Sequence, residues 1–178
     1  MEEALLVERL KNNSTQELAF KDLVQTHKER LYWHIRKIVI NHDDADDVLQ
    51  NTFLKVFKSI ANFKGESKIF SWMYRIATNE AINFLNTKAR MVNTSPEMLQ
   101  MKRVEQLEDD PYFDGDELQI RLQKAIALLP QKQQIVFNMR YFDEVKYEEM
   151  SEILETSVGA LKASYHQARK KIEKYFEE

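Results

Sequence analysis

Two long stretches of the chain, residues 1–87 and 117–176, carry apolar side chains at the spacing of helices with one buried face. Apolar residues recur there every three or four positions, which is the period of an amphipathic α-helix. The first stretch predicts four helices, at residues 2–11, 15–40, 43–60 and 68–86. The second predicts four more, at residues 117–129, 130–141, 147–154 and 158–176. The pattern therefore predicts an all-α protein.

The residues between the two stretches break this pattern. They contain two of the three prolines and a cluster of acidic residues, and they have no sustained apolar face. Such a composition is typical of a linker, here with at most one weak helical turn near residues 98–107. We expect two small helical domains, a helical bundle at residues 1–90 and a four-helix domain at residues 117–178, joined by an acidic flexible linker at residues 91–116.

The last two predicted helices have the spacing of a helix-turn-helix, because a three-residue turn, Glu155-Thr156-Ser157, separates them. Ser157 is a suitable N-cap for the second helix. Small and basic residues occupy the arc opposite its apolar face: Gly159, Lys162, Ala163, His166, Arg169 and Lys170. Such a face predicts contacts with bases or phosphates in a major groove. The alternative is a solvated helix whose basic residues suit its C-terminal dipole.

A second polar face lies on the predicted helix at residues 68–86 and on the loop before it. Its side chains combine aromatic rings, positive charge, a hydroxyl and an amide: Phe63, Lys64, Ser67, Trp72, Arg75 and Asn79. Stacking surfaces, charge and amide hydrogen bonds are what unpaired bases require. The alternative is that Trp72 caps the bundle and that the polar residues are solvated.

The composition argues against several classes of function. There is no cysteine, the four histidines lack metal-binding spacing, and the three glycines form no phosphate loop. We therefore expect no catalytic residues and no bound metal or cofactor. The N-terminus is charged from its second residue, and no apolar run approaches the roughly 18 residues of a membrane span. We expect a soluble, cytoplasmic protein without membrane insertion.

The net charge of −3 is unevenly distributed along the chain. Residues 91–117 contain eight acidic and two basic residues, whereas the segments on either side are each close to neutral. Nonspecific affinity for nucleic acid comes mainly from the neutralisation of phosphates. Neither segment is basic enough to bind DNA tightly by charge alone. If the protein acts on DNA, we therefore expect a partner that contributes binding affinity.

Two runs of the sequence resemble a known family, the extracytoplasmic-function (ECF) sigma factors of bacterial RNA polymerase. Their second conserved domain is similar to DDADDVLQNTFLKVFKSIANFKGESKIFSWMYRIATNEAINFL. Their fourth conserved domain is similar to LPQKQQIVFNMRYFDEVKYEEMSEILETSVGALKASYHQARKKIEKYF. The two runs occur in the order and at the separation of the family. With their flanking helices they cover most of the chain outside the linker.

The resemblance implies a transcription initiation factor that binds core RNA polymerase, recognises the minus-thirty-five and minus-ten elements of promoter DNA and assists promoter melting. The last helix would read the double-stranded minus-thirty-five element. The polar loop and the helix after it would bind the single-stranded minus-ten element, with Asn79 at a position that lines the pocket for a flipped base. Core polymerase would bind Asp47, Gln50 and Asn51. An anti-sigma factor is implied as a further partner.

The chain departs from the family at three of these positions. Asn51 stands where the family usually has an acid, so one ion pair to the polymerase is expected to be missing. Ser164 and Gln167 stand where many relatives have arginines, which reduces the expected set of base contacts.

The acidic linker suits a strand that threads a basic channel of the polymerase, where it would mimic nucleic acid.

Two other classes of function remain open on the residues alone. A stand-alone helix-turn-helix regulator, with residues 1–87 as a dimerisation or sensor domain, predicts tight and salt-sensitive binding to duplex DNA. A helical adaptor whose exposed faces bind protein alone predicts no effect on DNA. A sigma factor predicts weak DNA binding by itself and promoter-specific transcription with core polymerase.

Overall fold

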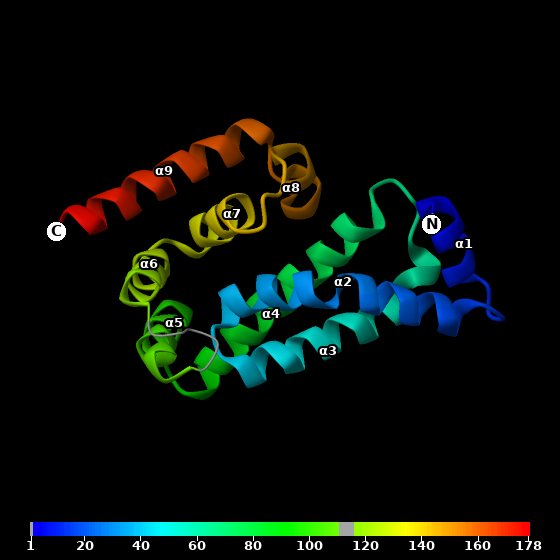
Figure 1. Cartoon of the computed structure of the whole chain (residues 1–178), viewed down its shortest axis with the longest axis horizontal. Coiled ribbons are helices and arrows are strands. Elements are labelled where there is room, and N and C mark those ends of the chain that lie inside the picture. The colour runs from blue at the N-terminus through cyan, green and yellow to red at the C-terminus, as the bar shows by residue number, and fades with distance from the viewer. Residues whose placement is uncertain (1, 111–115) are drawn as a thin grey trace.

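The computed structural model describes residues 2–110 and 116–178, and every regular element in these two ranges is a helix. The predicted all-α fold is confirmed. The helices form two groups that lie against each other (Figure 1). Among the described helices, none is both long enough and apolar enough to cross a membrane.

The first group contains four α-helices, as predicted. They are α1 (Glu3–Lys11), α2 (Gln16–Val39), α3 (His42–Ser59) and α4 (Ile69–Met91). A short 3-10 helix, η1 (Ile60–Asn62), and a loop join α3 to α4. The long helices α2, α3 and α4 lie side by side, and α1 lies near the end of this bundle where η1 and the loop are found (Figure 1).

A local signal explains where α3 begins. The side chain of Asn41 caps the helix by accepting a hydrogen bond from the backbone N–H of Asp44 at 3.0 Å. Asp43 and Asp44 lie in the first turn, where negative charge interacts favourably with the helix dipole. Asn41 therefore caps the helix, and the aspartates that follow it stabilise the first turn.

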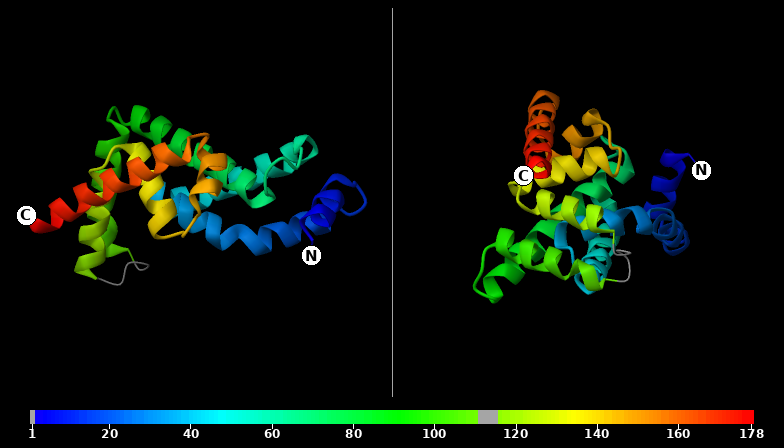
Figure 2. Two further views of the ribbon diagram at one scale, coloured as in Figure 1. Left: turned by 90° about the horizontal axis from the view of Figure 1, so that it is seen from above. Right: turned by 60° about the vertical axis from the view of Figure 1, so that its left-hand side comes forward.

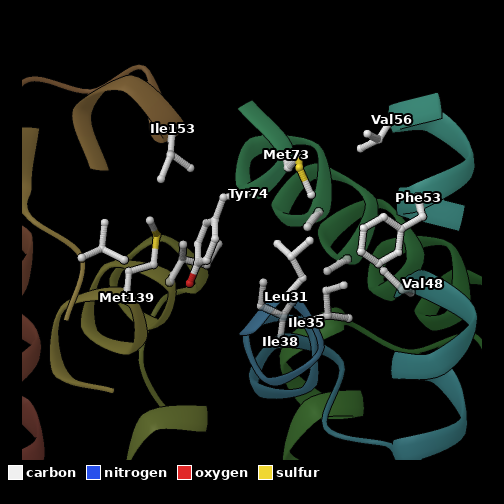
Figure 3. Packing of buried hydrophobic residues seen from close by; sticks show 14 of the residues in the cluster. Leu31, Ile35, Ile38, Val48, Phe53, Val56, Met73, Tyr74, Met139 and Ile153 are labelled. Carbon is white, nitrogen blue, oxygen red and sulfur yellow. The ribbon is translucent and has the colours of Figure 1, made fainter. Parts of the chain in front are cut away.

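The core of the first group lies between α2, α3 and α4 (Figure 3). Leu31 and Ile35 of α2, Val48 of α3 and Met73 of α4 are almost fully buried, and the ring of Phe53 packs beside them. Each buried side chain of this size contributes about 1.5–3 kcal/mol. The helical spacing of these residues therefore both predicts the elements and supplies the energy that holds them together.

The predicted flexible linker is largely helical in the structure. Helix α5 (Pro96–Glu105) begins where the Ser95 hydroxyl accepts a hydrogen bond from the N–H of Met98 at 3.2 Å, and η2 (Gln106–Asp109) follows it. Leu99 and Val104 are buried. The expectation of a flexible linker is wrong for this part; residues 111–115, which it also covered, lie outside the described residues.

Polar contacts also attach α5 to the first group. The side chain of Gln100 donates a hydrogen bond to the carbonyl oxygen of Ile38 at 2.8 Å. Arg103 donates to the carbonyl oxygen of Val39 at 2.9 Å and forms an ion pair with Asp44 at 2.7 Å. These contacts satisfy carbonyl groups at the C-terminal end of α2, which have no partner within the helix. The docking of α5 is thus specific.

The second group contains α6 (Glu117–Ala127), α7 (Gln131–Tyr141), α8 (Tyr147–Leu154) and α9 (Val158–Glu177), close to the four predicted helices. Its own core is formed by buried side chains of α6, α7, α9 and the turn between α6 and α7: Ala125, Ile126, Leu129, Phe137, Ala168 and Ile172. Helix α9 runs along the outside of this group (Figure 2).

The two groups share a continuous apolar contact. Met139 of α7 and Ile153 of α8 point toward Tyr74 of α4 (Figure 3), and all three belong to the same buried cluster as the core of the first group. Such a contact buries side chains that would otherwise be exposed on both groups. The structure therefore holds the C-terminal group against α2 and α4.

Candidate nucleic-acid interface

The predicted helix-turn-helix is formed by α8 and α9. Helix α8 ends at Leu154, and the next residue, Glu155, has a φ of 51°, in the left-handed region. Two residues later, the hydroxyl of Ser157 accepts a hydrogen bond from the N–H of Ala160 at 3.2 Å and caps α9. The predicted turn and its cap are confirmed.

Helix α9 packs through one face, and its opposite face is exposed. Leu161, Ala168 and Ile172 lie on the packed face. The predicted duplex-binding residues are all exposed: Gly159, Lys162, Ala163, His166, Arg169 and Lys170. A Cβ added at Gly159 would meet no protein atom within 4 Å, so packing within the chain does not require glycine there. The structure brings these residues onto one accessible surface, and their contact with DNA stays a prediction.

The charged groups of this surface are held by weak contacts. Arg169 pairs with Glu173 at 3.1 Å, and both side chains are more than half exposed, so the pair contributes little to stability. The ammonium group of Lys162 lies 5.7 Å from the centre of the Tyr147 ring, within range of a cation–π contact. Both cations can therefore move to an external phosphate or base at little cost.

The loop between η1 and α4 contains part of the predicted single-strand site. Lys64 is exposed, and Ser67 is half-buried. Gly65 has a φ of 74°, which a residue with a side chain rarely adopts. The glycine therefore sets the turn that presents Lys64 to solvent.

Phe63 and Trp72 differ from the expectation of exposed stacking surfaces. The ring of Phe63 is 4% exposed and packs against Trp72, with ring centroids 5.0 Å apart. Trp72 itself is half-buried. Burial of an aromatic ring is favourable because it removes apolar surface from water. Phe63 therefore anchors the loop in the core, and the exposed part of Trp72 is the aromatic surface that remains accessible.

Arg75 and Asn79 of α4 face the second group of helices. The guanidinium group of Arg75 pairs with the Glu155 carboxylate at 2.5 Å. A hollow of about 270 Å³ lies beside them, with Arg75, Thr78 and Asn79 on one side and residues of α7 and α8 on the other. Asn79 is exposed, as the sequence placed it, whereas Arg75 is half-buried, and α8 lies across the hollow from both.

A buried polar cluster lies at the contact between the two groups. Asp143, in the loop after α7, has a side chain that is 6% exposed. It accepts hydrogen bonds from the Tyr74 hydroxyl and from the Lys37 ammonium group, the latter at 2.6 Å. Nδ1 of His34 lies 3.6 Å from the same carboxylate. Helical periodicity missed this cluster, because its members come from distant segments and carry no local motif.

Burial and charge act in opposite directions on this cluster. Burial by itself raises the pKa of Asp143, but the nearby His34 and the Lys37 ammonium group outweigh it and hold the pKa at about 2. Burial lowers the pKa of His34, and burial together with the Asp143 charge raises the pKa of Tyr74. Asp143 is thus ionised at neutral pH. Within the described ranges, no group of three or more His, Cys, Asp or Glu side chains could hold a metal ion.

The predicted polymerase-docking residues lie on the outer face of α3. Asp47, Gln50 and Asn51 are all exposed. Leu54, which is 53% exposed, adjoins them one helical turn later. Leu54 was not predicted because it lies outside the buried face of α3, although its spacing from Gln50 and Asn51 is visible in the sequence. Together they form a polar face with one apolar side chain.

Family models match both groups of helices. The model described as sigma-70 region 2 matches residues 23–91, and the model described as sigma-70, region 4 matches residues 119–172. The first match covers α3, α4 and most of α2. The second covers most of α6 and α9 and the whole of α7 and α8.

Similar proteins extend over nearly the whole chain. The RNA polymerase sigma-H factor of Pseudomonas aeruginosa is 27% identical over 95% of this chain and 91% of its own length. The ECF RNA polymerase sigma factor SigW of Bacillus subtilis is 29% identical, with 88% of each chain covered.

Two solved structures share the fold. CnrH, solved in complex with the cytosolic domain of CnrY, has a TM-score of 0.73 and 19% identity over 98% of this chain and 97% of its own. RpoE of Bartonella quintana, solved in complex with the anti-sigma factor NepR, has a TM-score of 0.67 and 18% identity over 89% of this chain and 96% of its own.

Proposed function

The chain belongs to the ECF family of RNA polymerase sigma factors, and we propose that it divides promoter recognition between α9 and the surface formed by α4 and the loop before it. Helix α9 reads the double-stranded minus-thirty-five element. The loop and α4 bind the melted minus-ten strand. The outer face of α3 docks on core RNA polymerase. Residues 1–90, 91–116 and 117–178 serve as the polymerase and minus-ten domain, the connection, and the minus-thirty-five domain.

The observation that carries this proposal is the exposed basic and small face of α9 after a tight three-residue turn. A helix placed in this way fits the major groove, and long basic side chains then reach base edges or phosphates. Lys162, His166 and Arg169 lie at intervals of about one helical turn along this face. Gly159 and Ala163 have no long side chains that project from this face, which permits the helix to approach the groove wall closely.

The minus-ten site supplies a different chemistry. Lys64 offers charge to the phosphates, Trp72 offers part of its ring for stacking, and Asn79 offers an amide to the edge of a flipped base. Ser67 and Arg75 complete the site with a hydroxyl and a guanidinium group. Because Arg75 pairs with Glu155 and Asn79 faces α8, the two groups of helices separate before the melted strand binds.

Core polymerase contributes the affinity that the chain lacks. Breaking duplex stacking costs about 1.4 kcal/mol per base-pair step, and a protein with a net charge of −3 has little general attraction for phosphates. We place the contact with polymerase at Asp47, Gln50 and Asn51, and we add Leu54 as an apolar anchor within the same face. A polar rim around a buried apolar side chain is the usual composition of such an interface.

An anti-sigma factor is the further partner that we propose. Both solved neighbours were obtained in complexes, one with a cytosolic domain and one with a protein named as an anti-sigma factor. In the structure Arg75 is paired with Glu155 at the end of α8, and Asn79 lies across a hollow from α8. A partner that binds this closed arrangement would hold the minus-ten surface away from DNA without contacting every residue of it.

Run-off transcription with core polymerase, with and without this chain, tests the proposal. We expect promoter-specific transcripts when both are present, and weak, salt-sensitive DNA binding by the chain alone. Tight binding to duplex DNA in the absence of polymerase, without any effect on transcription by core enzyme, would contradict the proposal and support a stand-alone regulator.

Asn79→Ala should impair open-complex formation while leaving minus-thirty-five binding intact.

A further inference from the structure

Helix α1 contacts both ends of the loop that carries part of the proposed minus-ten site. The ammonium group of Lys11 donates a hydrogen bond to the carbonyl oxygen of Phe63 at 2.5 Å, where the loop begins. The carboxylate of Glu3 accepts a hydrogen bond from the backbone N–H of Ile69 at 2.8 Å, where the loop ends and α4 starts. One short helix thus forms hydrogen bonds at both ends of the loop at residues 63–68.

The start of α4 depends on this contact because its own sequence does not supply a cap. Lys68, the N-cap residue, makes no side-chain cap, and the first turn at residues 69–72 contains no acidic residue. The N–H groups at the start of a helix need acceptors, and a negative charge there is favourable. Glu3 provides both from a separate helix.

The position of α1 is itself fixed, so it can act as a support. Leu10 is fully buried in the core, and Leu6 and Val7, which are partly buried, pack against the same core cluster. The hydroxyl of Thr15 donates a hydrogen bond to the carbonyl oxygen of Arg9 at 2.8 Å and closes the turn between α1 and α2. A support anchored in the core can hold a loop in one conformation, whereas a loop tied at one end alone would move.

We propose that Glu3 and Lys11 are positioning residues, which hold the loop at residues 63–68 in the conformation that binds the melted minus-ten strand. This inference rests on the proposed function of that loop. Lys11 holds the Phe63 backbone so that its ring stays against Trp72, and Gly65 then turns Lys64 outward. Helix α1, which contributes no residue to the DNA-contacting set, thereby influences minus-ten recognition.

The first test measures the loop without DNA or polymerase. The chain has two tryptophans, and a Trp33→Phe background leaves Trp72 as the fluorescent probe beside Phe63. Glu3→Ala with Lys11→Ala should red-shift the Trp72 emission and raise its quenching by acrylamide about twofold, because the loop opens locally. Glu3→Gln with Lys11→Arg, which keep an acceptor and a donor, should restore most of the wild-type signal. Glu8→Ala, an exposed position on the same helix, is the matched control.

The second test measures promoter opening with core polymerase. The double alanine variant should form open complexes roughly fivefold more slowly, since it loses one hydrogen-bonded cap and one charged hydrogen bond. Its affinity for duplex minus-thirty-five DNA should be unchanged. If the double variant is too unstable to assay, Lys11→Ala alone should give about half of the effect on a logarithmic scale.

The outcomes separate this inference from the function on which it rests. Lys64→Ala and Asn79→Ala, made in the wild-type chain, test the minus-ten site directly. If these two slow opening but the α1 variants leave both Trp72 and opening unchanged, the positioning role is wrong. If the α1 variants change Trp72 while neither they nor the site variants affect opening, the minus-ten assignment of the loop is wrong, and with it the role of α1 in recognition.

Discussion

Asp143 shows how one side chain can join two parts of this molecule. Lys37 and His34 of α2 and Tyr74 of α4 surround its carboxylate, and Arg30 of α2 donates to its backbone carbonyl oxygen at 3.4 Å. A buried carboxylate is costly unless charges and donors surround it. The depressed pKa of Asp143 indicates that these groups more than offset the burial.

The Asp143 cluster predicts a pH dependence of stability. Because the folded protein lowers the pKa of Asp143 from 3.8 to about 2, its contribution is fully present above pH of about 4 and is lost as the pH falls toward 2. Asp143→Asn should therefore lower the free energy of unfolding at pH 7 by about 2 kcal/mol. Urea unfolding at pH 7, 5 and 3 measures this difference, which should shrink at pH 3.

The neighbouring residue provides the control for Asp143. Glu144 is exposed, so Glu144→Gln should change stability by less than about 0.5 kcal/mol at each pH. Equal losses at pH 7 and pH 3 in Asp143→Asn would show that the ionised carboxylate is not what holds the two groups together.

The basic residues of α9 give a second residue-scale prediction. Arg169→Ala and Lys162→Ala should each weaken binding of the holoenzyme to minus-thirty-five DNA by about 1–3 kcal/mol if they contact base edges. Promoters that differ at single minus-thirty-five bases should then be discriminated less well. Competition binding on a promoter set measures both effects. Lys174→Ala, at an exposed position nearer the end of α9, should leave discrimination unaltered.

At the scale of elements, the cap of α9 determines how firmly the recognition helix begins. The Ser157 hydroxyl is the side-chain acceptor at this end, and loss of such a cap typically costs about 1 kcal/mol. Ser157→Ala should therefore lower the free energy of unfolding by about this amount and increase amide exchange in the first turn of α9. Ser157→Asp, which retains an acceptor, should behave like the wild type. Identical amide exchange in the first turn of α9 in Ser157→Ala and Ser157→Asp would argue against the capping role of Ser157.

Helix boundaries were predictable where they depend on neighbours in the sequence. The turn at residues 155–157 and the cap at Ser157 follow from local preferences, and the structure has both. Helix α5 carried a comparable signal, Ser95 followed by Pro96 and Glu97. The acidic composition of the surrounding segment obscured it, and its apolar side chains gain their stability from α4, α6 and Ile40 rather than from a long face of their own.

Contacts between distant segments could not be predicted in this way. Phe63 was expected to be exposed because it stands in a polar loop, but its ring packs against Trp72 and within the buried core cluster. Likewise, Glu80 interrupts the apolar pattern of α4, and the structure pairs it with Lys55 of α3. Periodicity identifies which face of a helix is buried, but it does not identify the residue that pairs with a polar side chain within that face.

At the scale of the whole molecule, three negatively charged groups of the second group of helices face cations of the first. Asp143 contacts Lys37, Glu149 pairs with Lys68 at 3.2 Å, and Glu155 pairs with Arg75 at 2.5 Å. Lys68 and Arg75 lie at the proposed minus-ten surface. If these cations bind the melted strand as proposed, the carboxylates of Glu149 and Glu155 compete with its phosphates for them.

This arrangement predicts that removing the carboxylates of Glu149 and Glu155 favours the open molecule. Glu149→Gln with Glu155→Gln should increase the affinity of the isolated chain for single-stranded minus-ten DNA several-fold, because each of these partly solvent-accessible pairs contributes up to about 1 kcal/mol to closure. Distance measurements between labels on α3 and α9 should show a larger open population. Raising the ionic strength should shift the wild type in the same direction, since exposed pairs are screened.

Glu152 separates a specific effect from a general change in charge. It is exposed on the same helix as Glu149, so Glu152→Gln changes the net charge by one without removing one of these pairs. If it raises DNA affinity as much as either Glu149→Gln or Glu155→Gln alone, the gain comes from general electrostatics and not from opening. If both single variants open the molecule but DNA affinity stays constant, α8 does not cover the strand-binding surface. A gain confined to Glu149 and Glu155, together with a longer distance between α3 and α9, is the result expected when the C-terminal group must leave α4 before the promoter strand can bind.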